Sequence, residues 1–80
     1  GRDLNQGRYE QAVAHLAKKL AVDPDADAFN NLGLAHFRLA RLQQARTSYQ
    51  AALDLDPDNA AANTNMANLL WATGELDGAI

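Results

Sequence analysis

The chain has 80 residues, of which 48% are hydrophobic, and it carries a formal net charge of −3. The absence of cysteine excludes a disulfide framework and a thiolate zinc site. Nucleic-acid binding is disfavoured because it relies on an excess of Lys and Arg, and no apolar run approaches the ~20 residues that span a membrane.

The sequence repeats itself along its length. Residues 12–25 (AVAHLAKKLAVDPD) align with residues 45–58 (ARTSYQAALDLDPD) at an offset of 33. Residues 31–33 (NLG) align with residues 65–67 (NMA) at an offset of 34. A period of this length is typical of stacked helical arrays.

Apolar and small residues recur at helical spacing, which predicts helices over residues 8–21, 26–39, 42–55 and 60–73. Pro24 and Pro57 end helices because proline disfavours helical dihedrals in the residue before it. The residues after them, Asp25, Asp58 and Asn59, are expected to cap the next helices. The short links between paired helices force an antiparallel arrangement. These links contain Gly7, Ala40-Arg41 and Gly74, and the two glycines suit left-handed helix ends.

These residues resemble the tetratricopeptide repeat, whose pattern is W-x2-L-G-x2-Y, A-x3-F and P. The middle copy matches it most fully, with Phe29, Leu32, Gly33, His36, Ala45, Tyr49 and Pro57. In the third copy Asn63 replaces the aromatic residue. The resemblance implies an all-α solenoid of antiparallel helix pairs, about two and a half repeats long. We expect a partial repeat at 1–25, a complete one at 26–59 and a partial one at 60–80.

The pattern also predicts how the helices pack. Gly33 and Ala67 on first helices, and Ala45 and Ala79 on second helices, lack bulk and allow the axes to approach closely. The buried side of helix 26–39 is predicted to contain Phe29, Leu32, Gly33, His36 and Leu39.

The resemblance implies that the first helices of the pairs line a concave binding surface. Its predicted contact residues are uncharged except for one base, and they comprise Asn30, Asn31, Leu34, Phe37, Arg38, Thr64, Asn65, Asn68 and Trp71. Asn31 and Asn65 occupy equivalent places, and carboxamides can pair with any peptide group. This is similar to the asparagine ladder of the O-linked N-acetylglucosamine transferase family, although both amides contact water in the alternative interpretation. Trp71 either anchors a ligand or covers a following repeat.

The sequence therefore predicts a non-catalytic module that binds a peptide segment of a protein partner. It predicts no catalytic residues, metal site or cofactor. One alternative is a structural scaffold that self-associates through open repeat ends bearing Leu4, Leu16, Leu69, Leu76 and Ile80. Another is the substrate-recruiting part of a larger enzyme. Nothing in the composition selects a compartment.

Overall fold

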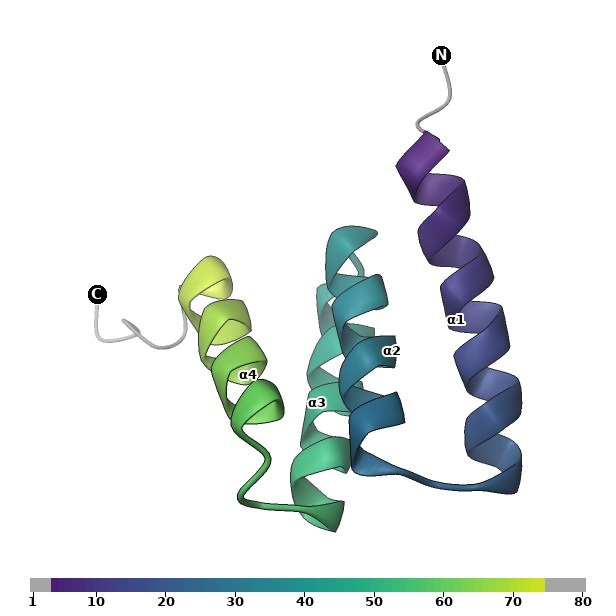
Figure 1. Ribbon diagram of the computed structural model, residues 1–80. Helices are drawn as coiled ribbons and strands as arrows, with labels where there is room; N and C mark the ends of the chain where they lie inside the picture. The colour runs from purple at the N-terminus through teal and green to yellow at the C-terminus, as the bar shows by residue number, and fades with distance from the viewer. Residues whose placement is uncertain (1–3, 75–80) are drawn as a thin grey trace.

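Residues 4–74 form four α-helices, each running antiparallel to the one before it (Figure 1). The computed structural model describes residues 4–74, which form α1 (Leu4–Val22), α2 (Ala26–Arg38), α3 (Leu42–Leu55) and α4 (Ala60–Thr73). α1 packs on α2, α2 packs on α3, and α4 packs on both α2 and α3. In Figure 1, α3 lies behind α2, with α1 and α4 to either side. No strand occurs between residues 4 and 74, and the predicted all-α class is confirmed.

The three later helices match their predicted ranges to within one residue, whereas α1 begins at Leu4 instead of residue 8. Gly7 was expected at a left-handed link, and that prediction is wrong because Gly7 lies inside α1. No neighbouring atom comes within 4 Å of the position that a Cβ of Gly7 would occupy. A larger residue would therefore fit at this position, and the helix continues through the glycine.

Side chains just before α2 and α4 cap the N-terminal ends of these helices. The Asp27 backbone N–H donates to Asp25 Oδ1 over 3.0 Å at the start of α2, and the Ala62 N–H donates to Asn59 Oδ1 over 2.9 Å at the start of α4. Asp25 and Asn59 are thus the predicted caps. Asp58 does not cap α4; its N–H donates to Asp56 Oδ1 over 3.2 Å.

The two links that follow first helices share a left-handed residue. Gly74 after α4 has φ 83°, and Ala40 after α2 has φ 62°. Glycine adopts this region freely, whereas an L-residue with a Cβ pays a steric penalty of about 1–2 kcal/mol. Ala40 is therefore a strained position, and the equivalent Gly74 is not.

The core lies between α2, α3 and α4. Ala45 and Tyr49 of α3 and Leu69 of α4 are at most 1% exposed, and the half-buried side chains that pack against them are Phe37, Leu42 and Met66. Leu69 was expected on an open end, and its burial corrects that prediction. Leu76, Ala79 and Ile80 lie outside the described residues.

Gly33 makes room for this core. An ideal Cβ on Gly33 would lie 2.5 Å from Cδ1 of the Tyr49 ring and 3.1 Å from the carbonyl oxygen of Ala45. Real Cβ atoms do not approach so closely, so only glycine fits here without displacing the ring. The predicted role of Gly33 at a close helix contact is confirmed.

Candidate peptide-binding face

The predicted contact residues lie on two neighbouring helices, α2 and α4. The N-terminal ends of these helices are tied together, because Asn59 Nδ2 donates to Asp27 Oδ1 over 3.0 Å. Asn59 therefore caps α4 through its oxygen and holds α2 through its nitrogen. We call the exposed side formed by Asn31 and Arg38 of α2 with Thr64, Asn68 and Trp71 of α4 the α2–α4 face.

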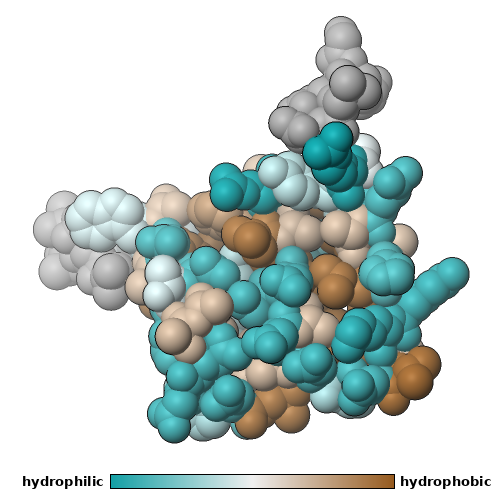
Figure 2. Space-filling model, in the orientation of Figure 1, coloured by the Kyte–Doolittle hydropathy of each residue, from teal (hydrophilic) through white to brown (hydrophobic). Residues whose placement is uncertain are grey.

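The α2–α4 face offers several kinds of contact. Asn31 and Asn68 each carry an amide that both donates and accepts hydrogen bonds. Arg38 adds a cation, and Trp71 is 67% exposed. Trp and Arg are the residues over-represented where binding energy concentrates at interfaces. In Figure 2 hydrophilic side chains cover most of the visible surface, and apolar ones emerge in patches between them.

Asn30 and Asn65 are not available as free amides. Asn65 Nδ2 donates to Asn30 Oδ1 over 2.7 Å, and Asn30 is 7% exposed. Asn30 was expected on the accessible surface, and its burial overturns that expectation: a buried amide needs a partner, and Asn65 supplies it. The pair joins α2 to α4, so the free amides of this face are Asn31 and Asn68, one helical turn out of register.

Phe37 also differs from its expected place. The sequence places it among contact residues, whereas in the structure it is half-buried and packs against the cluster of Ala45, Tyr49 and Leu69. Leu34 is likewise half-buried. Both residues therefore have less side-chain surface free for a partner than the exposed residues of the α2–α4 face.

His36 lies on the other side of α2, near α1. Its Nδ1 atom is buried without a hydrogen-bond partner. Burial lowers the pKa of the His36 imidazole, the Arg41 guanidinium lowers it further, and Glu10 acts in the opposite direction. Arg41 forms an ion pair with Glu10 of α1. Sequence reasoning missed this pair, because no local pattern connects residues so far apart in the chain.

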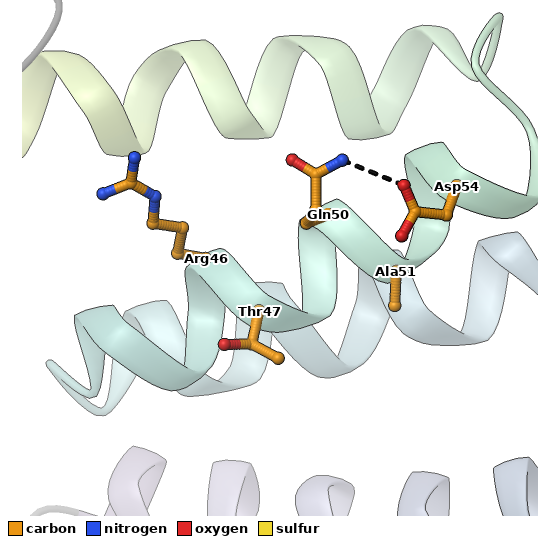
Figure 3. Close-up of a pocket in the computed structure, with 5 residues that line it drawn as sticks. All are labelled: Arg46, Thr47, Gln50, Ala51 and Asp54. Atoms are coloured by element: carbon orange, nitrogen blue, oxygen red, sulfur yellow. Dashed lines mark hydrogen bonds between the residues drawn. The ribbon is translucent and has the colours of Figure 1, made fainter.

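A shallow cavity of about 400 Å³ lies along α3 (Figure 3). Figure 3 shows Arg46, Gln50 and Asp54 directed toward α4, and Gln50 Nε2 donates to Asp54 Oδ1 over 3.1 Å. Thr47 and Ala51 complete the lining. All five residues belong to one helix, so no groups converge on a common point from different elements. This cavity does not have the arrangement of a catalytic or small-molecule site.

The described part of the chain also lacks two other kinds of feature. Between residues 4 and 74 no group of three or more His, Asp or Glu side chains is placed to hold a metal ion. In the same range no helix is long and apolar enough to cross a membrane.

Comparison with known proteins connects this architecture to a family. The sequence model of the tetratricopeptide repeat matches residues 2–60 and 31–80. Sperm-associated antigen 1 of Mus musculus is 34% identical over 74 residues, which are 92% of this chain and 8% of that protein. The Hsp70-Hsp90 organizing protein of Triticum aestivum is 34% identical over 62 residues, covering 76% of this chain and 11% of that protein.

One bacterial relative is named as an enzyme. The probable biofilm formation methyltransferase WspC of Pseudomonas putida is 37% identical over 79 residues, which are 98% of this chain and 19% of that protein. The chain thus spans less than a fifth of the length of each of these relatives.

Proposed function

The chain belongs to the tetratricopeptide repeat family, and we propose that it binds a peptide segment of a protein partner along the α2–α4 face without catalysing a reaction. Repeats of this family generally mediate protein–protein interactions. The proposal includes the repeat boundaries expected from the sequence: a complete repeat at 26–59 between partial ones at 1–25 and 60–80.

The observation that carries the proposal is the set of exposed groups on two adjacent helices. The free amides of Asn31 and Asn68 can pair with the backbone of a peptide whatever its side chains are. Trp71, 67% exposed, offers a large apolar surface at the C-terminal end of α4. Because α4 has no charged side chain, Arg38 supplies the positive charge of the face, and an acidic residue in the peptide would complement it.

A peptide-array experiment tests this proposal. The chain is applied to an array of diverse peptides beside the double variant Asn31→Ala/Asn68→Ala, which removes both free amides. Each hydrogen bond contributes about 0.5–1.5 kcal/mol. We therefore expect the retained peptides to bind the variant roughly tenfold to hundredfold more weakly.

A matched control tests whether binding depends on amides of the α2–α4 face in particular, or on the loss of any two exposed amides. The variant Gln43→Ala/Gln44→Ala removes two exposed amides from α3, outside the α2–α4 face, and should bind the same peptides with unchanged affinity. All variants must first show a native thermal melt. Equal losses in both variants, or a loss in neither, would contradict the assignment of the α2–α4 face.

A second candidate function is favoured by the WspC relatives, which are named as probable methyltransferases. In that case the chain is the part of a larger enzyme that recruits its substrate, and the same face holds the substrate protein. The array experiment applies to both candidates. They differ in whether the retained sequences are also methylated by the longer protein.

A further inference from the structure

In the described part of the chain, α2 is joined to α4 by side-chain hydrogen bonds at two places. Asn59 Nδ2, at the cap of α4, donates to Asp27 Oδ1 over 3.0 Å. This bond is exposed, so water competes for both partners. Asn65 Nδ2 donates to Asn30 Oδ1 over 2.7 Å. Asn30 is only 7% exposed, and a buried amide without a partner is costly, so this second bond is the stronger constraint on the two helices.

The apolar contacts of α4 do not by themselves select one position along α2. Ala62, Met66 and Leu69 belong to its buried side and recur about once per helical turn. Apolar attraction is not directional, so a shift of one turn, about 5.4 Å along the axis, would bring similar side chains to the same place. A hydrogen bond weakens steeply with distance and misalignment, and the Asn30–Asn65 bond would not survive that shift. A single buried asparagine sets the register of coiled-coil helices for the same reason.

The position of α4 in turn decides the geometry of the α2–α4 face. Asn31 follows Asn30 directly in α2, and Asn68 comes three residues after Asn65 in α4. Each free amide therefore lies within one helical turn of the buried pair. A shift or rotation of α4 relative to α2 changes the distance between the amides of Asn31 and Asn68, and a peptide bound to both at once requires that distance to be constant.

We propose that Asn30 and Asn65 are positioning residues of the α2–α4 face. Their hydrogen bond fixes the distance between the free amides of Asn31 and Asn68, and neither side chain of the pair contacts the peptide. The inference rests on the proposed function, because the peptide is the ligand that benefits. A face that is already ordered binds more tightly, since α4 need not be immobilised when the peptide arrives.

The variant Asn30→Leu/Asn65→Leu tests this role, because leucine keeps the branched shape of asparagine without its hydrogen-bonding groups. Replacing both partners of a buried polar pair by apolar residues is often neutral or stabilising. The melting temperature should therefore stay unchanged or rise, while the peptides retained on the array should bind about tenfold more weakly. Stability and affinity that fall together would indicate a merely structural pair and would overturn the proposal.

A double-mutant cycle separates positioning from direct contact. Asn31→Ala/Asn68→Ala removes the amides whose distance the pair sets. Adding this change to the leucine variant should therefore weaken binding less than it does in the unmodified chain. Additive losses would mean that the pair contacts the peptide itself, which would overturn the positioning role.

The matched control is Gln43→Leu/Gln44→Leu, which replaces two exposed amides of α3 by leucine. Peptide affinity should be unchanged in this variant, because α3 lies outside the α2–α4 face. A loss equal to that of Asn30→Leu/Asn65→Leu would reject the proposal, since any pair of leucine substitutions would then have the same effect.

The relative position of α2 and α4 is measured without any peptide. The chain has no native cysteine, so spin labels can be attached at Arg38→Cys and Ala61→Cys, which are both exposed positions. Double electron–electron resonance should give one narrow distance distribution when Asn30 and Asn65 are intact, and a broader or second distribution in the leucine variant. If the leucine variant does not melt cooperatively, Asn30→Ala/Asn65→Ala takes its place in this measurement.

The two readouts distinguish the two ways of failing. An unchanged distance distribution would overturn the positioning role whatever the array shows. An array on which the unmodified chain retains no peptide would instead refute the proposed function, because the distance measurement needs no ligand.

Discussion

Replacement of Gly33 by alanine probes the closest contact between α2 and α3. An ideal Cβ at this position lies 2.5 Å from Tyr49 Cδ1, 2.6 Å from Tyr49 Cε1 and 3.1 Å from the Ala45 carbonyl oxygen. The Tyr49 ring has little room to retreat, because the residue is only 1% exposed. Overpacking of this kind costs about 1–3 kcal/mol. Alanine recovers about 0.8–1.0 kcal/mol through its helix propensity, so the free energy of unfolding should fall by about 0–2 kcal/mol.

A second glycine provides the reference that isolates the packing cost. Gly7 also lies inside a helix, but it is exposed and has no neighbour within 4 Å of the Cβ position. Gly7→Ala should therefore gain stability through propensity alone, by up to about 1 kcal/mol. The difference between the two variants removes the propensity contribution and should be about 1–3 kcal/mol.

Thermal and urea unfolding, followed by circular dichroism, measure this difference. For a chain of this size 1 kcal/mol corresponds to about 4–8 °C in the melting temperature, so the two variants should be clearly separated. In a Tyr49→Leu background the ring is absent, and Gly33→Ala should then cost much less. If Gly33→Ala stabilises the chain as much as Gly7→Ala does, the close contact with Tyr49 does not limit the packing and the reasoning is refuted.

Three further changes have defined expectations. Ala40→Gly should raise the free energy of unfolding by about 0.5–1 kcal/mol in urea titrations, because the relief of a left-handed alanine at φ 62° outweighs the entropy that glycine adds to the unfolded state; an unchanged midpoint would argue against strain there. Asn59→Ala should lower the free energy of unfolding by about 0.5–2 kcal/mol, because it removes the cap of α4 and the hydrogen bond to Asp27. Asn59→Asp keeps the capping oxygen but places a second carboxylate beside Asp27, so it should also be less stable than the unmodified chain; unchanged midpoints in both variants would contradict these roles of Asn59. Because burial lowers the pKa of His36 in the folded chain, the unfolded chain takes up the proton first as the pH falls. Stability should thus decrease as the pH falls below about 6.5, and His36→Gln should reduce this dependence; a pH profile that His36→Gln leaves unchanged would contradict the prediction.

Local signals in the chain account for the helices. Pro24 and Pro57 lie in the turns that separate α1 from α2 and α3 from α4, and the side chains of Asp25 and Asn59 cap the helices that follow. Capping and proline effects involve residues close in sequence, so they can be recognised without knowledge of the tertiary structure. The repeat pattern also predicts that Gly33 packs closely against a second helix. The short distance between the Gly33 Cβ position and the Tyr49 ring of α3 confirms this prediction. Gly7 shows the limit of predicting helix ends from local sequence, since a glycine permits a left-handed turn but does not cause one.

The composition of the binding face depends on the tertiary structure. Periodicity places Asn30, Phe37 and Asn65 on the same side of their helices as Asn31 and Trp71, but a small rotation of a helix about its axis decides which of them become buried. Packing turns Phe37 toward Tyr49 and brings Asn65 within 2.7 Å of Asn30, a residue 35 positions earlier in the chain. The sequence by itself therefore determined the helices, their order and the close contact at Gly33. Only the fold decided that Asn30 and Asn65 hold α2 to α4 and that Asn31, Asn68 and Trp71 remain free, because burial is a property of the packed helices together.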